Sequence, residues 1–579
     1  MLKPKESNIG VMKFSSNNKL AWIAIGFVLL ANILLLSWIG VSLVTVVGAF
    51  SVQAIMALGG SALIHTYRER ISDPVLFYLS GYCLGLIILY MSGFVWMHRG
   101  LLGTTPKWAA LVSFAPLCVL AVVGLRQGIM SKSQMSPLRA IPLAIILTVS
   151  FFVTALATYG FDNNARRVKI NQPEWRQNEN MVPIWSWQGD RDAHYLKIVT
   201  STVKDGFPPE RVNHRGFHVS TIFVTLLTGE MSRPRFMHTY KSMAWLYFFM
   251  LAYGLYAIGR KLLDLGDRLS AFVASSALLF SPLKLPLFEL SPTYRGFYSA
   301  SGTLYHSDTQ YTSTAISVMG LYLVLNALKT KSRTFFLGCA IIAGAFFLKP
   351  SNFMVLAPAC YLFALICWKD WSRDRLAGLA ILMAIPILWL SYLYFTGSTS
   401  SFDGVLGRDA QGNRGAVTGM PNMAIKIQFF AGYLPKLQGR FPDWMAQSNA
   451  LMVLSMIFLS FAAFWAGGFT ALKKTFDDTK IRPARVIQHM HTYAHIYFFF
   501  AFFTAAILLS STLGEYRSKN INWKWSAAAS YVLCIPLFAK GITLVKSPVL
   551  RRISWGLYGF QLMQGMGYLA YLFWYSKLI

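Results

Sequence analysis

The chain has few charged residues, and acidic ones are scarcest. Asp, Glu, Lys and Arg make up only 13% of its 579 residues, against a hydrophobic share of 55% and a mean hydropathy of +0.46. A soluble domain would carry about a quarter charged residues. Apolar runs of about twenty residues, the length that crosses a hydrocarbon core, recur along the chain. The alternation typical of a membrane β-barrel is absent. The sequence therefore predicts an all-α polytopic membrane protein.

Cysteine pairs and the common catalytic motifs are also missing. The polar loops contain no cysteine, because all six lie in or beside apolar runs, which argues against disulfides and zinc sites. There is no His-Glu-x-x-His, Gly-x-Ser-x-Gly or Walker-type sequence. These absences exclude zincin, serine-hydrolase and P-loop chemistry.

Positive charge is abundant but dispersed. The net charge of +30 comes from 53 Lys and Arg against 23 Asp and Glu. The cations recur at the ends of apolar runs, which is typical of residues that orient spans and contact anionic lipids. We therefore expect no nucleic-acid partner.

Hydropathy predicts about 13–15 transmembrane helices, the first a retained span beginning near Leu20 rather than a signal peptide. With a cytoplasmic N-terminus, the basic short connections fall on one side and three polar loops on the other. This requires Phe217–Thr228, whose apolar core is too short to span, to be an interfacial or re-entrant helix. The expected location is an inner (plasma) membrane of bacterial type, with an extracytoplasmic site.

The polar loops divide the chain into four predicted regions. These are an N-terminal five-span bundle at 1–159, a large extracytoplasmic loop with juxtamembrane helices and an acidic motif at 160–239, a transmembrane core with two further outer loops at 240–448, and C-terminal transmembrane helices at 449–579. The first five spans could be an appendage, because the polar loops begin only after them.

The three outer loops gather residues that suit transfer from a phosphate-activated donor. A carboxylate can act as a general base or metal ligand, and Arg or Lys can hold a leaving phosphate. The candidates are Asp190, Asp192, His194 and Tyr195 in the first loop, Arg295, His306 and Asp308 in the second, Arg408 in the third, and Lys349 at a span end on the same side.

Plainer interpretations remain open for several of these residues. Asp190 and Asp192 flank Arg191 and could form ordinary loop ion pairs. Ser307 or Asp308 could be the N-cap of the span that follows. Arg408 could be a solvated loop charge, and Lys349 an interfacial anchor beside a turn.

A separate histidine cluster lies on the predicted cytoplasmic side. His491 and His495 are spaced i, i+4, which would place them on one helical face, with His489 nearby. No acidic residue accompanies them in sequence. An interfacial cluster is the favoured interpretation over a metal site.

The acidic loop resembles the GT-C superfamily of polyprenyl-phosphate-dependent glycosyltransferases, including protein O-mannosyltransferases and aminoarabinose transferases. The resemblance rests on Asp192-Ala-His-Tyr195, on Gly206-Phe-Pro-Pro209, and on Ser301-Gly302 with His306-Ser-Asp308 before an apolar helix. It covers roughly residues 185 to 395. A strict Asp-Glu pair is absent, so the acting carboxylate is open between Asp190 and Asp192. Five spans precede the loop, where the family usually has one.

The resemblance implies inverting transfer of a sugar from a polyprenyl-phosphate or polyprenyl-diphosphate donor to a lipid, glycan or protein acceptor. Asp192 would deprotonate or orient the acceptor hydroxyl, and Arg295, Lys349 or Arg408 would hold the departing phosphate. His194, Tyr195, His306 and Asp308 would form an acceptor or second acidic site. Some relatives use a divalent metal, so Mg²⁺ or Mn²⁺ on Asp190, Asp192 and Asp308 stays open. The sugar, the acceptor and the oligomeric state are not specified.

Three other functional classes compete with this hypothesis, and one of them is a non-catalytic assembly partner within an envelope complex. An O-antigen-type polysaccharide polymerase or ligase would depend more on arginine and less on an early aspartate. A transporter or flippase usually shows internal repeats, and charges or broken helices at mid-membrane. The predicted placement of charges at span ends argues against a transporter.

Overall fold

The computed structural model describes residues 41–71, 73–98, 105–127, 140–155, 215–280, 308–366, 372–395 and 524–578, together with short pieces at 23–37, 129, 426–427 and 470–514. The described elements are helices apart from one two-residue antiparallel pair, β1 (Lys426–Ile427) and β2 (Leu513–Gly514). The protein is thus an α-helical membrane protein, as its composition predicts.

Five of the described helices are long and apolar enough to cross a membrane, with the segments Leu43–Leu63, Pro74–Trp96, Pro106–Arg126, His238–Leu262 and Tyr311–Thr330. They belong to α2 (Leu43–Leu63), α4 (Pro74–His98), α6 (Pro106–Arg126), α12 (Arg233–Ala257, continued by the π-turn η5, Ile258–Leu262) and α15 (Asp308–Thr330). All five coincide with predicted spans.

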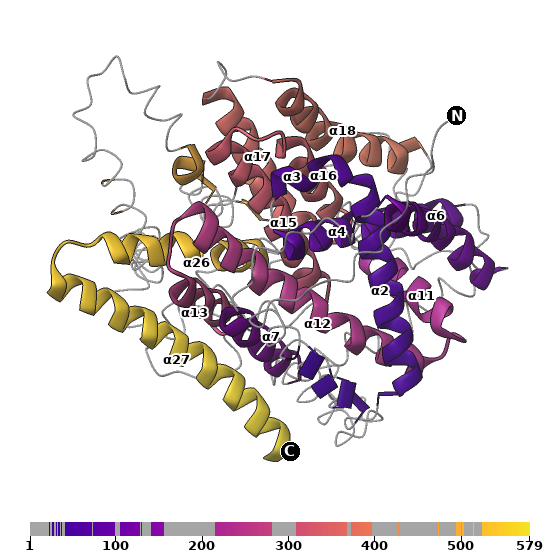
Figure 1. The fold of residues 1–579 in the computed structure, drawn as a ribbon, viewed down its shortest axis with the longest axis horizontal. Coiled ribbons are helices and arrows are strands. Elements are labelled where there is room, and N and C mark those ends of the chain that lie inside the picture. Colours follow the sequence, from indigo (N-terminus) through magenta and orange to yellow (C-terminus); the bar gives the residue numbers. More distant parts are fainter. Residues whose placement is uncertain are drawn as a thin grey trace, which may run out of the picture.

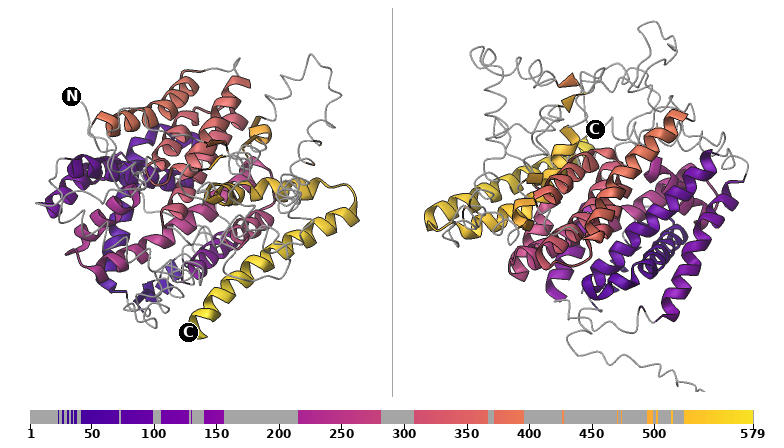
Figure 2. Two further views of the ribbon diagram at one scale, coloured as in Figure 1. Left: turned by 180° about the vertical axis from the view of Figure 1, so that it is seen from behind. Right: turned by 90° about the horizontal axis from the view of Figure 1, so that it is seen from above.

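The other described helices are α3 (Arg68–Ile71) after the single turn η1 (His65–Tyr67), α7 (Ala140–Ala155), α11 (Arg215–Thr228), α13 (Asp267–Ala277), α16 (Phe335–Ala345), α17 (Pro350–Ile366), α18 (Arg373–Phe395), α26 (Lys524–Leu544) and α27 (Pro548–Leu578). Helices α2 and α6 lie at one edge of the bundle, and the hairpin of α26 and α27 forms the opposite edge (Figure 1, Figure 2).

The helices give the bundle two distinct ends. The end where α11, α12 and α15 begin is called the loop end. The other end is called the basic end, and it carries Arg68–Ile71, Arg260–Lys261 and Lys329. Asp73, which precedes α4, pairs with Lys261 after α12, and Lys329 of α15 pairs with Asp264, so these segments share the basic end. The paired cations and carboxylates of the described segments therefore gather at one end of the bundle.

Small residues bring the N-terminal helices unusually close together. A Cβ added at Gly60 of α2 would collide with the backbone of Gly81 in α4, and one at Gly59 would collide with Leu117 of α6. Helices in lipid gain little from the hydrophobic effect between them, so close backbone packing at small residues supplies much of their association. We therefore infer that α2, α4 and α6 form a rigid unit.

Helix α11 begins and ends at the loop end. The N–H of Gly216 donates to the Phe347 carbonyl at 3.0 Å, near the end of α16. Beyond its other end, Glu230 pairs with Lys107 at the start of α6, and Arg235 of α12 donates to the Thr228 carbonyl. Between these points α11 crosses α2, α4 and α6. Residues 216–226 are buried, so α11 fits the re-entrant interpretation better than the interfacial one.

Two predicted spans are shorter than expected. The stretches Leu269–Phe280 and Phe335–Leu348 form α13 and α16, each of 11 residues. At 1.5 Å per residue each covers only about 16 Å, roughly half of a hydrocarbon core. The early end of α16 creates the turn on which the candidate site is built.

Candidate functional site

Most of the candidate residues lie outside the part of the chain that the structure describes. These are Asp190, Asp192, His194, Tyr195, Arg295, His306 and Arg408. Asp308 is the first residue of α15, and Lys349 lies directly before α17. The described site is therefore built from Lys349 and from the helices that receive the ends of the first two loops.

Lys349 ends a turn, Phe346–Lys349, that lies inside the bundle; we call it the recessed turn. The Ser313 hydroxyl contacts the carbonyls of Lys349 at 3.1 Å and Ala345 at 3.4 Å, and the Tyr90 hydroxyl donates to the Gly344 carbonyl at 2.6 Å. Helix α4 continues beyond Tyr90 to His98, roughly 12 Å further toward the loop end.

Helix α12 extends still further past the recessed turn. Tyr311, two residues before Ser313, packs its ring against Tyr247 and Phe248, with centroids 6.0 and 4.9 Å apart. Since α12 begins at Arg233, about four helical turns lie between that contact and its start. Lys349 is thus deeper than the span-end position expected from the sequence. Non-helical backbone below the ends of spans occurs only where protein or a water-filled space surrounds it.

An amide and two hydroxyls lie beside the recessed turn. Asn352, in the first turn of α17, is 1% exposed and donates its Nδ2 hydrogens to Ser313 Oγ at 3.3 Å and Thr314 Oγ1 at 3.1 Å. Its Oδ1 atom has no hydrogen-bond partner among the described residues. A buried acceptor left unpaired costs about 1–3 kcal/mol, so this oxygen is placed to accept a hydrogen bond from a bound molecule or a water.

The end of the first polar loop meets the recessed turn. The first polar loop ends at residue 214, directly before α11. The backbone N–H of Gly216, in the first turn of α11, donates a hydrogen bond to the Phe347 carbonyl. A Cβ on Gly216 would lie 2.9 Å from that carbonyl oxygen, so only glycine allows this close approach. The second loop ends at α15, whose Ser313 contacts Lys349. Both loops carrying the predicted acidic motifs therefore return to the bundle next to this lysine.

Helix α4 packs against both the recessed turn and α11. Tyr90 and Phe94 pack against Phe347, with ring centroids 5.9 and 5.8 Å apart. One helical turn away, Gly93 lies against Val219 and Phe223 of α11. Helix α4 therefore contacts both the recessed turn and α11.

Two helix N-termini and a lysine lie at the recessed turn. Helices α11 and α17 both begin beside it, and a helix N-terminus carries a partial positive charge with unpaired N–H groups. Lys349 adds a formal charge. A phosphate oxygen is the chemistry that such a combination accepts most readily.

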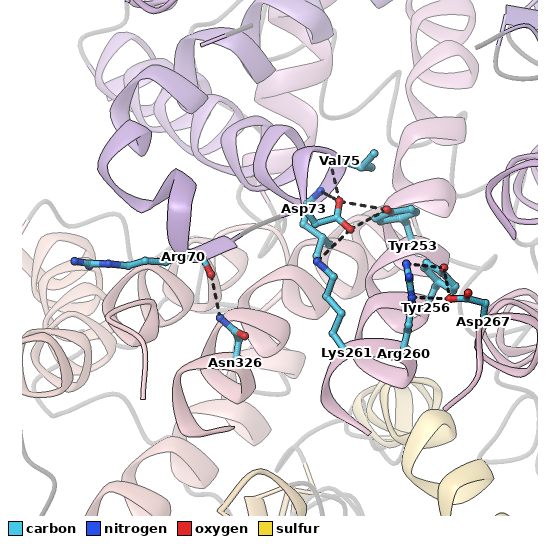
Figure 3. Close-up of polar contacts among 10 residues, drawn as sticks. Arg70, Asp73, Val75, Tyr253, Tyr256, Arg260, Lys261, Asp267 and Asn326 are labelled. Carbon is cyan, nitrogen blue, oxygen red and sulfur yellow. Dashed lines mark hydrogen bonds and ion pairs between the residues drawn. The ribbon is translucent and has the colours of Figure 1, made fainter. Parts of the chain in front are cut away.

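The basic end contains a paired charge network, shown in Figure 3. Asp73 accepts hydrogen bonds from the backbone N–H groups of Val75 and Leu76 and from Tyr253, and it pairs with Lys261 at 3.4 Å. Asp73 is 7% exposed. Its carboxylate therefore caps α4 and joins that helix to the end of α12.

The same end holds two further ion pairs. Arg260 pairs with Asp267 at 2.5 Å, and Tyr256 contacts both. Lys329 pairs with Asp264 at 2.9 Å and also donates to the carbonyls of Lys261 and Leu262. Asp264 has a φ of 53°, a left-handed conformation that Asp tolerates, and it reverses the chain between η5 and α13.

Asp374 lies at the start of α18, where it is partly buried. Partial burial raises the pKa of the Asp374 carboxyl above its ordinary value, and the backbone N–H of Phe336, with Arg70 and Arg333 nearby, opposes that shift. Its geometry is that of a helix-joining contact between α18 and α16.

No metal site emerges in the part of the chain that the structure describes. His495 is buried there, while His489 and His491 lie outside it. No three His, Cys, Asp or Glu side chains of the described residues approach closely enough to hold an ion. The metal alternative for Asp190, Asp192 and Asp308 remains a sequence prediction.

Comparisons with protein-family models, curated proteins and solved structures give no match for this chain. The candidate site is therefore defined by its own residues. Sequence reasoning overlooked Asn352, Ser313, Thr314 and Tyr90. One signal was available, because Thr312-Ser-Thr314 interrupts the apolar run of a predicted span.

Proposed function

We propose that this protein is a GT-C-like membrane glycosyltransferase. It would move a sugar from a polyprenyl-phosphate donor to a lipid, glycan or protein acceptor on the extracytoplasmic face. The observation that carries the proposal is the hydrogen bond between Gly216 and Phe347, because it fixes the end of the acidic loop beside Lys349.

In this mechanism Lys349 holds the donor phosphate as its bond to the sugar breaks. Fixed cations at a developing charge contribute several kcal/mol to such transfers. Asp192 is the proposed base or orienting group for the acceptor hydroxyl, with Asp190 as the alternative. Arg295 and Arg408 remain candidate phosphate ligands from the other two loops. The 13–15 spans and the inner-membrane location belong to the same proposal.

The direct test is a transfer assay with purified protein and a panel of polyprenyl-phosphate sugars, measuring released polyprenyl phosphate by mass spectrometry. We expect release by the wild type, almost none by Asp192→Asn, and release near the wild-type level by Arg126→Gln, an exposed cation on α6. Transfer by Asp192→Asn at the wild-type rate would reject the proposed base and favour an O-antigen-type polymerase or ligase.

One observation favours a second candidate, a lipid-linked glycan transporter or flippase. The re-entrant α11 and the recessed turn place helix N-termini and a lysine below the helix ends, a feature of transporter sites. The two functions differ in their products. Flux of a lipid-linked sugar in proteoliposomes, without a new covalent product, would support the transporter and reject the transferase.

A further inference from the structure

The C-terminal hairpin is cationic without any acidic residue to balance it. From Tyr516 to Ile579 the sequence contains no Asp or Glu, whereas Lys and Arg recur throughout. Asp264, which precedes α13, interacts electrostatically with Lys540 of α26. Counter-charges for the remaining cations must come largely from outside this segment.

The cations concentrate where α26 passes into α27. Lys546, Arg551 and Arg552 are exposed, and none of them forms an ion pair with another described residue. Ser547 caps α27 by accepting the Leu550 N–H at 3.4 Å, which fixes the orientation of this first turn.

Exposed apolar side chains alternate with these cations. Val549, Leu550 and Ile553 are 62%, 58% and 54% exposed. A soluble polyanion would match the charges but leave these side chains in water. The boundary between headgroups and acyl chains satisfies both kinds of side chain at once.

The position of this turn fits the same boundary. Lys540, near the end of α26, interacts electrostatically with Asp264 and Lys329 at the basic end, so the turn from α26 to α27 lies there. Tyr558 of α27 contacts the hydroxyl of Ser276 and stacks on Phe538, which holds the hairpin against α13. Helix α27 has 31 residues, about 46 Å, against roughly 30 Å for a hydrocarbon core. Figure 1 shows the hairpin at the edge of the bundle, where lipid has access.

We propose that residues 546–553 form a binding surface for anionic phospholipid headgroups, here called the hairpin surface. Lys546, Arg551 and Arg552 contact the headgroup phosphates, and Val549, Leu550 and Ile553 insert beside the acyl chains. This inference does not depend on the transferase proposal, because it concerns the opposite end of the bundle.

The test titrates the detergent-purified protein with phosphatidylglycerol and counts bound lipids by native mass spectrometry. Because each cation near an anionic surface contributes about a fivefold change in affinity, the double variant Arg551→Gln/Arg552→Gln should bind roughly twenty- to thirtyfold more weakly. Arg551→Lys/Arg552→Lys, which keeps the charge, should retain most of the binding. Phosphatidylcholine and inorganic phosphate should bind equally weakly to all variants.

The matched control is Arg126→Gln, an exposed single cation at the basic end of α6. It should bind phosphatidylglycerol as the wild type does. Wild-type affinity of the double glutamine variant would overturn the proposal. So would an equal loss in Arg126→Gln, because the lipid would then respond to overall charge and not to the hairpin surface.

Discussion

The two ends of the bundle use their polar residues in opposite ways. At the basic end Asp73, Asp264 and Asp267 each face a cation, and these pairs tie together segments far apart in sequence. At the loop end, the Ser313 hydroxyl contacts the backbone carbonyl of Lys349, and the Asn352 Oδ1 has no partner among the described residues. The polar residues of the basic end hold helices together, whereas the loop end has a hydrogen-bond acceptor that a ligand could use.

The largest expected effect comes from the acidic loop. Asp192→Asn should lower transfer by about 10²- to 10⁴-fold, the usual contribution of a general base, with an unchanged melting temperature in detergent. The parallel variant Asp190→Asn decides which carboxylate acts. If both variants keep full activity, the loop end is not a catalytic site of this kind.

Lys349 and Lys261 give the sharpest contrast between the two ends. Lys349→Met should reduce transfer by about 10²- to 10³-fold, because a fixed cation at the leaving phosphate is lost. Lys261→Met should instead lower the melting temperature and leave the activity per folded molecule unchanged. A reversal of these results would contradict the assignment of the two ends.

Removal of Asp73 should be the most destabilising change at the basic end. Asp73→Ala leaves Lys261 without its carboxylate and uncaps α4, and loss of one partner of a buried pair costs about 3–5 kcal/mol. We expect a clear fall in melting temperature. The matched control Glu230→Gln, in the exposed pair with Lys107, should change stability by under about 0.5 kcal/mol.

Asn352→Leu should separate ligand binding from stability. The variant removes a buried oxygen that has no described partner, along with two hydrogen bonds to hydroxyls, so we expect a stability change of only about 1 kcal/mol. Donor KM should rise while the melting temperature stays close to that of the wild type. A large fall in melting temperature with unchanged KM would show that Asn352 only holds the fold.

The smallest effect is expected from Tyr90→Phe. This variant removes only the hydrogen bond to the Gly344 carbonyl, worth about 1 kcal/mol, and keeps the ring packing on Phe347. If α4 positions the recessed turn, kcat should fall severalfold, while the melting temperature changes only slightly. Tyr78→Phe, on the same helix but near the basic end, is the control and should leave kcat unchanged.

Long apolar runs made much of the fold predictable, because each such run was expected to form one helix. This expectation failed where packing ends a helix inside an apolar run. Val75–Trp96 and Tyr311–Leu328 lie within α4 and α15 because each must satisfy its backbone inside one helix. The early end of α16 was not predictable, since Phe346 and Phe347 are as apolar as the helix before them. It depends on Tyr90, Gly216 and Ser313, which come from distant parts of the chain.

Of the described site residues, the sequence identified the charged ones and missed the uncharged ones. Lys349 stood out as a cation in an apolar stretch, but its depth follows from the contacts of Ser313 and Tyr311. The partners of Asp73 were also hidden, because Tyr253 and Lys261 lie about 180 residues away in sequence. Pairings over such separations are fixed by helix packing, which hydropathy does not encode.

The most direct test of the loop end as the functional end is an experimental structure with bound polyprenyl phosphate. We predict that its phosphate lies within about 3 Å of the Lys349 ammonium, with Asp192 facing the same phosphate. A phosphate bound elsewhere, with Lys349 and Asp192 far apart, would contradict the proposed site.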